Sequence, residues 1–234
     1  MIQKQKKSVM KIEIRETMDG SRTLYLKEID EHYHSTFGAI QESRHVYIRE
    51  GFNQCLLRDI RVLEIGFGTG LNCYLTILEC LKKGKHVHYY AAEKFPVTED
   101  IWKNLKYSDH FEDCDSGLFE HLHIVPWNCE VELNNQFTIF KMECDVLQSD
   151  FKDLPLIDLV YFDAFSPEKQ SELWQMSVFE NLFTRMNDDG ILVTYCAKGY
   201  VRRLLQTVGF TVERVPGPPG KREMLRARKR KIVN

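Results

Sequence analysis

The sequence predicts an α/β fold of the open, doubly wound type, in which helices cover both faces of a mostly parallel sheet. From residue 60 onward, short apolar runs alternate with amphipathic segments of helical period. The first apolar run is followed directly by a glycine-rich turn, residues 66–70. Such folds bind ligands at that place, outside the carboxyl ends of the strands.

The composition is that of an ordinary globular chain. Its 234 residues, 43% hydrophobic and 28% charged, most economically form one large domain with a small appendage. The basic start has no apolar h-region, and no stretch approaches the roughly 20 apolar residues of a membrane helix, so we expect a cytoplasmic protein without membrane contact. The seven cysteines are scattered without a C-x-x-C, which predicts reduced thiols and no metal site.

The N-terminal region is predicted to form a β-hairpin. Residues 12–29 alternate in the manner of a strand around an Asp19-Gly20 turn. A polar and aromatic stretch follows, and it becomes helical around residues 39–52.

The remaining elements alternate between strand and helix. The expected strands are 60–65, 86–93, two within 129–145 around an Asn134-Asn135 turn, 156–165, 191–197, 210–215 and 223–229. The expected helices are 70–84, 97–108, 172–186 and 199–209. The last strand, after a PGPPG loop, is expected to be antiparallel.

The glycine turn, VLEIGFGTG, indicates which cofactor is bound. Leu71 stands where the dinucleotide fingerprint requires its third glycine, and no P-loop lysine is present. The pattern E-x-G-x-G-x-G instead resembles the loop of S-adenosylmethionine-dependent methyltransferases. Gly66, Gly68 and Gly70 would then line the cofactor, with support from Glu64.

Two acids stand at the ends of later strands. Glu93 can accept both ribose hydroxyls of an adenosine, and Asp145 can accept the adenine amino group. A plain solvent-exposed acid is the alternative for each.

Asp163 is the predicted catalytic residue. It ends the fourth strand, in DAFSP, beside the position of a transferable methyl group. Methyl transfer is an in-line displacement, so a carboxylate there can orient an attacking amine and relay its proton. Its alternative is a helix N-cap or a turn acid.

Six segments together resemble a known family, the methyltransferase domain of the bifunctional tRNA 5-methylaminomethyl-2-thiouridine biosynthesis protein and its stand-alone relatives. They are YHSTFGAIQESRHVYI (33–48), VLEIGFGTGLN (62–72), EKFP (93–96), DAFSPEKQSELW (163–174), TYCAKGYVRRLLQ (194–206) and GPPGKREMLRA (217–227). The resemblance runs through roughly residues 30 to 228. Many methyltransferases share the glycine loop, whereas the QESRHVYI, DAFSP and GKREMLRA segments are more family-specific.

The resemblance implies that 5-aminomethyl(-2-thio)uridine at the tRNA wobble position is converted to its methylaminomethyl form with S-adenosylmethionine. It implies a hairpin and covering segment over residues 1–55 and a Rossmann-like class I methyltransferase domain over residues 56–234, in one structural unit. Gln41, Glu42 and Ser43 would close over the pocket, and Asn72 would join the cofactor site.

The remaining expected roles concern the tRNA. An unpaired wobble base can be taken into a pocket by stacking and edge contacts. Phe165, Tyr195 and Trp174 are candidates for stacking, with a place in the core as the alternative for each. Ser166 and Pro167 would line the substrate side. Lys221 and Arg222 begin a run, 221–231, of seven basic residues and one acid, which is either a solvated end or a patch that contacts anticodon-stem phosphates.

The sequence departs from the bifunctional protein in one respect. Nothing in 234 residues corresponds to its FAD-dependent oxidase domain, so other enzymes are expected to supply the aminomethyl precursor. A small-molecule amine N-methyltransferase or an aminopropyltransferase on the same fold is the main alternative. A cofactor-sensing or RNA-binding module without activity is another. His32, His34 and His45, near the expected pocket entrance, are read as structural.

Overall fold

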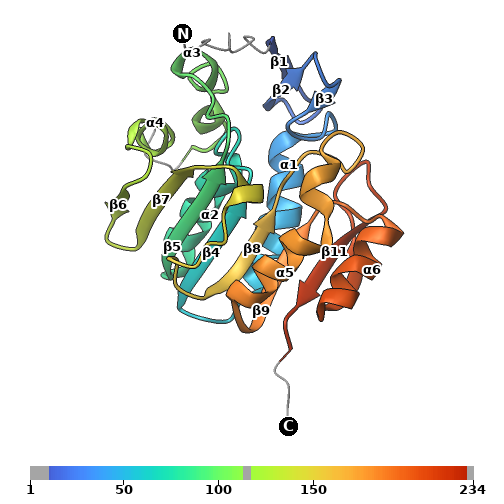
Figure 1. Cartoon of the computed structure of the whole chain (residues 1–234). Coiled ribbons are helices and arrows are strands. Elements are labelled where there is room, and N and C mark those ends of the chain that lie inside the picture. The colour runs from blue at the N-terminus through green and yellow to red at the C-terminus, as the bar shows by residue number, and fades with distance from the viewer. Residues whose placement is uncertain (1–10, 113–116, 231–234) are drawn as a thin grey trace, which may run out of the picture.

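The computed structural model describes residues 11–112 and 117–230, which form two β-sheets with helices around them (Figure 1). The basic start up to residue 10, Cys114 and Lys231, which entered the sequence predictions, lie outside the described residues. The large sheet has eight strands in the order β10-β11-β9-β8-β4-β5-β7-β6, and the small sheet has three in the order β1-β2-β3.

The strands have the following bounds: β1 Ile12–Glu16, β2 Arg22–Leu26, β3 Glu31–His32, β4 Asp59–Ile65, β5 His86–Glu93, β6 Glu130–Asn134, β7 Phe137–Glu143, β8 Ile157–Phe162, β9 Met186–Thr194, β10 Thr211–Pro216 and β11 Glu223–Arg228. The α-helices are α1 Ala39–Ser43, α2 Leu71–Lys83, α3 Glu99–Trp102, α4 Leu118–Ile124, α5 Met176–Arg185 and α6 Gly199–Val208. A π-helix, Arg44–Arg49, continues α1, and short 3-10 turns make up the remainder. None of the helices within the described ranges combines the length and apolarity needed to cross a bilayer.

The predicted doubly wound α/β fold is confirmed. Strands β4, β5, β7, β8 and β9 run parallel, while the last strand, β11, is antiparallel to both β9 and β10. Strand β4 pairs with β5 on one side and with β8 on the other, so strand order reverses at β4. The loop after β4 therefore lies at the switch point, where this architecture binds ligands.

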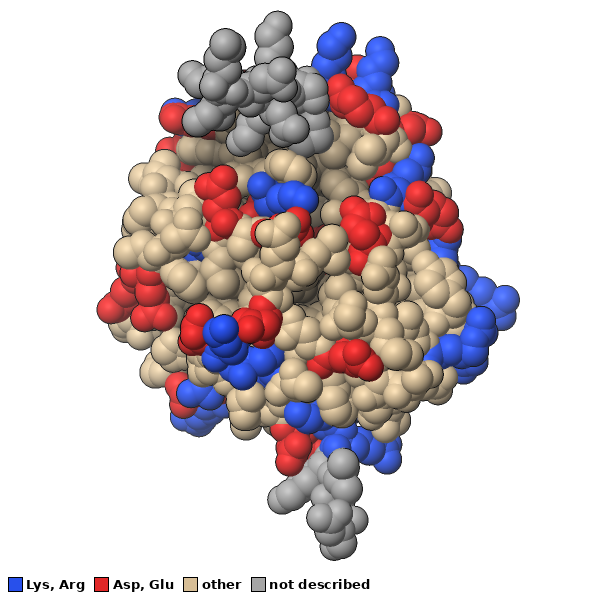
Figure 2. All heavy atoms as spheres, viewed as in Figure 1, with Lys and Arg blue, Asp and Glu red and all other residues tan. Residues whose placement is uncertain are grey.

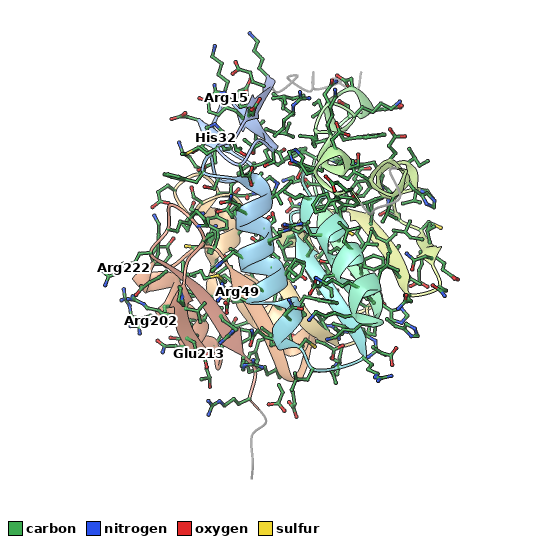
Figure 3. All side chains as sticks on the ribbon, turned by 180° about the vertical axis from the view of Figure 1, so that it is seen from behind. Arg15, His32, Arg49, Arg202, Glu213 and Arg222 are labelled. Atoms are coloured by element: carbon green, nitrogen blue, oxygen red, sulfur yellow. The ribbon has the colours of Figure 1, made fainter. Side chains whose placement is uncertain are left out.

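The core lies on both faces of the large sheet, because its central strands are apolar on both sides. In β8, Leu159 and Tyr161 pack with α2 and the π-helix on one face, while Val160 and Phe162 pack with α5 and α6 on the other. Figure 1 shows α5 and α6 on the near face, and Figure 3 shows the helix formed by α1 and the π-helix on the opposite face.

Some predicted boundaries were wrong. The helix expected over 97–108 is only the short α3, and the chain leaves helical geometry by Lys106, which has φ +52°. Helix α4 lies in a stretch for which no helix is predicted. The strand expected over 191–197 begins earlier, at Met186, where the pairing of β9 with β8 shifts register and Asp189 takes φ +62°. These are local irregularities that periodicity does not predict.

The small N-terminal sheet lies over the carboxyl edge of the large sheet (Figure 1). Arg22 donates to the carbonyl of Asn104 at 2.6 Å, and Tyr107 donates to the carbonyl of Arg22 at 2.8 Å. The Asp19 carboxylate accepts from the backbone of Gln41 at 3.0 Å. These contacts position the segment between β3 and α1 above the loop that follows β4.

Candidate active site

A cavity of about 680 Å³ opens at the carboxyl edge of the large sheet, beneath the N-terminal sheet. Ten of the residues predicted for the site line it: Glu42, Gly66, Gly68, Glu93, Asp145, Asp163, Phe165, Ser166, Tyr195 and Lys221. Eight predicted residues do not belong to its lining: Gln41, Ser43, Glu64, Gly70, Asn72, Pro167, Trp174 and Arg222. We call the part around Gly66, Gly68, Glu93 and Asp145 the cofactor half, and the part around Glu42, Asp163, Phe165, Tyr195 and Lys221 the acceptor half.

The glycine loop needs its glycines for two physical reasons. Gly66 has φ +91°, and a Cβ there would stand 2.6 Å from the carbonyl oxygen of Asp163. Gly68 has φ +49°, and a Cβ there would meet the ring of Tyr33 at 3.1 Å. The positive φ and the nearby atoms both exclude larger residues at these two positions. Gly66 and Gly68 line the cavity, so the backbone of the loop faces it without intervening side chains.

Glu93 stands at the end of β5 with its carboxylate fixed by two backbone groups. One oxygen accepts from the Gly68 amide at 2.9 Å and the other from the Phe95 amide at 2.7 Å. Each carboxylate oxygen can accept more than one hydrogen bond, so both keep capacity for a ligand's hydroxyls.

Asp145 follows β7 and caps a short 3-10 turn by accepting from the Leu147 amide at 3.0 Å. Lys94 forms an ion pair with it at 2.7 Å. That hydrogen bond is the main reason why the pKa of Asp145 lies below its usual value. Leu147 and Phe95, both half-exposed, line the same half of the cavity and offer apolar faces to a planar base.

Asp163 follows β8 and is held by two donors. The Tyr47 hydroxyl, from the π-helix, donates to one carboxylate oxygen, and the Asn72 amide donates to the other at 2.7 Å. Burial raises the pKa of Asp163 to about 7, although the hydrogen bond from Tyr47 opposes this shift. The carboxyl group therefore changes protonation near neutral pH.

Glu64 lies below the cavity and does not reach it. The residue is fully buried and accepts from Asn72 at 2.9 Å and from the Tyr89 hydroxyl at 2.9 Å. Burial raises its pKa well above the usual value. Its position indicates that Glu64 fixes the side chain of Asn72, which in turn donates to Asp163, and that Glu64 does not contact a ligand.

Lys221 is placed differently from the expectation that it contacts phosphates. Its ammonium group donates to Glu42 at 2.6 Å and lies 3.9 Å from the centre of the Tyr195 ring. Glu42 also accepts from the Ser35 amide at 2.7 Å and is buried. The interaction joins the β10–β11 loop to the segment before β4 and keeps the cation inside the acceptor half.

The neighbours of Glu42 do not take part as expected. Gln41 is exposed and Ser43 is fully buried, and neither lines the cavity. Adjacent helical residues point in different directions, so only one of the three can face the pocket.

Two of the three aromatic candidates face the cavity, and Trp174 does not. Trp174 is 3% exposed, packs on Phe162 and donates to the Phe165 carbonyl at 2.8 Å. It therefore supports the cavity wall at Phe165 from the core side. Tyr195 donates to the carbonyl of Ala164 at 2.9 Å. Of the two readings of Trp174, a core residue or a stacking platform, the structure supports the core residue.

The loop after β8 is tied to the N-terminal sheet. Ser166 donates to Glu31 of β3 at 2.8 Å, while Pro167 is buried next to it. The ring of Phe165 meets that of Tyr33 edge-on, with centroids 5.1 Å apart. The cavity is thus bridged above the acceptor half.

Sequence reasoning missed Tyr47, Lys94 and Tyr33. Tyr47 is one apolar residue in the run HVYI, and nothing local marks it as a partner of an acid 116 residues away. Lys94 and Tyr33 lie in segments 93–96 and 33–48, where the sequence predictions concern other residues, such as Glu93 and Glu42.

The cofactor half fits S-adenosylmethionine. The cavity volume lies within the range of about 300–1,000 Å³ that small-ligand sites occupy. A glycine loop without room for a Cβ, a fixed carboxylate on Glu93 and two half-exposed apolar side chains suit the methionine, ribose and adenine parts respectively.

Replacing Glu93 by Ala is expected to weaken S-adenosylmethionine binding by about 10- to 100-fold, because a ligand acceptor and the support of the glycine loop are both lost. Titration calorimetry measures this. Glu99→Ala, which removes an exposed acid paired with Lys103, is the control and should bind as wild type. Equal affinity of the Glu93 variant would remove that residue from the cofactor site.

Comparison with known proteins agrees with this geometry. A family model described as S-adenosyl-L-methionine-dependent methyltransferase matches residues 120–230. The tRNA 5-methylaminomethyl-2-thiouridine biosynthesis bifunctional protein MnmC of Chromobacterium violaceum is 30% identical over 207 residues, which cover 82% of this chain and 31% of that protein. The chain thus spans about a third of the length of the curated relative it matches.

Two of the similar solved structures illustrate the match. The crystal structure of MNMC2 from Aquifex aeolicus has a TM-score of 0.76 and 26% identity, covering 94% of this chain and 71% of that one. Spermidine synthase from Thermotoga maritima has a TM-score of 0.57 at 14% identity, over 98% of this chain and 72% of that one, which shows a shared fold alone.

Proposed function

This chain belongs to the S-adenosyl-L-methionine-dependent methyltransferases, in the family of the methyltransferase part of MnmC, and we propose that it methylates the aminomethyl nitrogen of 5-aminomethyl(-2-thio)uridine at the tRNA wobble position. The observation that carries this proposal is Asp163. Its carboxylate, in the acceptor half, is held by Tyr47 and Asn72, and its backbone carbonyl lies against Gly66 of the cofactor half.

The acceptor amine has to lose a proton. An alkyl amine has a pKa near ~10, so it arrives largely as an ammonium ion and has no free electron pair. When bound, S-adenosylmethionine supplies an electrophilic methyl group. Asp163 in its ionised form accepts the amine proton and so leaves a free electron pair on nitrogen, to which bound S-adenosylmethionine would supply its methyl group.

The acceptor half favours a cationic group. It contains the carboxyl groups of Glu42 and Asp163 and the ammonium group of Lys221, while Glu31, Glu172 and Lys169 also line the cavity near the loop after β8. Lys221 is neutralised by Glu42, which leaves Asp163 to attract the aminomethyl group. Phe165 and Tyr195 supply apolar walls for the uracil ring.

Part of the predicted basic run takes part in the fold. Arg226 pairs with Glu50 at 2.8 Å and with Glu213 at 2.9 Å, and Lys229 donates to the carbonyls of Phe183 and Met186. These cations stabilise β11 within the sheet. They are not available to a nucleic acid.

Three other cations are better placed for RNA phosphates. We call Arg202, Arg203 and Arg222 the arginine edge. No acid in the described part of the chain forms an ion pair with them, whereas Arg214 pairs with Glu223. Figure 2 shows both signs of charge mixed over one face, with basic side chains gathering towards the α6 edge. Figure 3 shows Arg202 and Arg222 projecting outward along this edge.

Replacing Arg202 and Arg222 together by Gln is expected to weaken tRNA binding and flatten its dependence on salt. Each lost phosphate contact lowers the slope of log K against log salt by about 0.7–0.9, so the double variant should lose about 1.5. Filter binding between 50 and 200 mM salt measures it.

Arg214→Gln is the matched control, because Arg214 lies on β10 beside the arginine edge but is paired with Glu223. Lys221→Gln should alter turnover with little change in slope, since its charge lies inside the cavity. A slope unchanged in the double variant would remove the arginine edge from the tRNA footprint.

A small-molecule amine methyltransferase or an aminopropyltransferase remains the second candidate, but only the shared fold favours it. Offering tRNA and small amines such as putrescine to the enzyme in parallel, with labelled cofactor, distinguishes the two. Label in tRNA alone supports the proposal, and label in the amine alone contradicts it.

A further inference from the structure

Thr69, in the middle of the glycine loop, is held from two sides by histidines. Its hydroxyl lies 2.8 Å from Nε2 of His34, and its carbonyl accepts from Nε2 of His123 at 3.1 Å. Thr69 is 1% exposed. The two histidines come from unrelated elements: His34 follows β3, and His123 is in the last turn of α4.

The loop needs such contacts because it is intrinsically soft. Gly66, Gly68 and Gly70 all have positive φ, and glycine loses more conformational freedom on ordering than any other residue. A loop that is already ordered before its ligand arrives does not lose that freedom on binding, so affinity is higher.

His123 is itself firmly placed. Its ring stacks on Trp102 with centroids 4.9 Å apart and planes 8° apart. Lys141, buried in β7, donates to the carbonyls of Leu122 and His123 at 2.9 and 2.8 Å, and so fixes the end of α4. Gly70 makes room, since a Cβ there would stand 3.0 Å from His123 Nε2.

His34 is placed by the N-terminal sheet. Its backbone amide donates to the Thr23 hydroxyl of β2 at 3.0 Å, and its side chain lines the cavity. The N-terminal sheet is therefore connected to the glycine loop through the side chain of His34.

Both imidazoles are suited to a site for a sulfonium cofactor. Burial lowers the pKa of His34 to about 4 and that of His123 to about 3, and the Lys141 charge adds to the effect at His123. Around His34, Glu42 and Asp19 oppose the shift and Lys221 favours it. Both rings stay neutral at pH 7, so they bind Thr69 without placing a positive charge next to the cofactor.

We propose that His34 and His123 are positioning residues for S-adenosylmethionine, which hold Thr69 from opposite sides and keep the glycine loop in its binding conformation before the cofactor arrives. The inference depends on the cofactor and not on the identity of the methyl acceptor. Residues of the N-terminal segment thus complete the cofactor site.

The test measures cofactor affinity by titration calorimetry, with S-adenosylmethionine and S-adenosylhomocysteine as probes. His34→Leu and Thr69→Val each remove one partner of the same hydrogen bond, and each should raise Kd about 3- to 10-fold. The double variant should bind the cofactor no more weakly than the weaker-binding single variant, because both substitutions remove the same hydrogen bond. His34→Gln, which keeps a nitrogen donor at a similar reach, should restore most of the affinity.

Two controls match these variants. His45→Leu removes a histidine whose Nε2 lies 2.7 Å from the Pro216 carbonyl, away from the loop, and should leave Kd unchanged. For the hydrogen bond from His123 to the Thr69 carbonyl, His123→Leu should weaken cofactor binding, whereas His121→Leu, on the exposed side of α4, should not.

Hydrogen exchange separates positioning from general stability. In the cofactor-free protein, amides of residues 66–70 should exchange faster in His34→Leu and Thr69→Val, while those of β8 and β9 stay protected. The proposal is overturned if Kd is unchanged, if the two losses are additive, or if His34→Gln is as weak as His34→Leu.

Discussion

Replacing Asp163 by Asn is expected to lower the rate of methyl transfer by about 10²- to 10⁴-fold, the range that a positioned general base contributes. The amide keeps the shape of the carboxylate and can still accept from Asn72 while donating to the Tyr47 oxygen, so the fold should persist. Single-turnover assays with labelled cofactor measure the loss. Affinity for S-adenosylhomocysteine, which carries no sulfonium charge, should stay within about threefold of wild type.

The control is Asp158→Asn, at the other end of the same strand. Asp158 is also a buried acid with two donors, the Arg61 amide at 2.8 Å and Asn187 at 2.7 Å, but it lies far along β8 from the cavity. Its replacement should alter stability more than rate. An Asp163→Asn enzyme with more than a tenth of wild-type activity would contradict the assigned role.

The pH dependence follows from the same residue. With the pKa of Asp163 at about 7, the ionised base is lost below neutrality, so kcat/KM should rise with pH and level off above about 7. The contribution of Asp163 to the free energy of unfolding changes with pH in the opposite direction. Because the folded-state pKa lies above the ordinary value of 3.8, the folded protein binds the proton more tightly, and this contribution to stability declines as pH rises from about 4 to 7.

Replacing Gly66 by Ala is expected to abolish measurable cofactor binding, with Kd raised at least about 100-fold. The new Cβ would stand 2.6 Å from the backbone carbonyl of Asp163, and φ of +91° is strained for any other residue. Because the obstructing atom is backbone, the loop has to move away from β8. Calorimetry with S-adenosylmethionine detects the loss.

Gly84→Ala separates strain from contact. Gly84 ends α2 with φ +61°, and a Cβ added there would meet no atom within 4 Å. The substitution should cost about 1 kcal/mol of stability, as a left-handed alanine does, and the variant should bind the cofactor as wild type. Similar affinity of the Gly66 and Gly84 variants would show that the loop does not approach the cofactor.

The cofactor half could be predicted because its signals are local. Gly66 and Gly68 directly follow an apolar strand, and Glu93 and Asp145 stand at or just beyond the ends of two further strands. In a parallel sheet the carboxyl ends of strands share an edge, so correct strand assignment is enough to bring these residues together.

The acceptor half could not be predicted to the same extent because its contacts are long-range. Glu42 and Lys221 pair across 179 positions, and Tyr47 reaches Asp163 across 116. Lys221 and Arg222 are neighbours in sequence, yet one packs against Tyr195 and the other is exposed.

The roles of the cations in the basic run 221–231 could not be separated from the sequence for a related reason. Met224, Leu225 and Ala227 are interspersed with its cations and are fully buried, which makes 223–228 an interior strand between β9 and β10. The sequence predicts this strand at 223–229, but the number of charges does not show which cations pair within the sheet. Arg222 and the cations of α6, for which the sequence indicates only a place in a helix, are the ones we propose for contact with RNA.

The central claim is tested most directly by methyl transfer from labelled S-adenosylmethionine to tRNA that carries 5-aminomethyluridine, with Asp163→Asn in parallel. The proposed function predicts label in the wobble nucleoside as the methylaminomethyl form, and its loss in the variant. Absence of label from an enzyme that binds the cofactor would contradict the proposed substrate. Label that persists in the variant would instead contradict the role of Asp163.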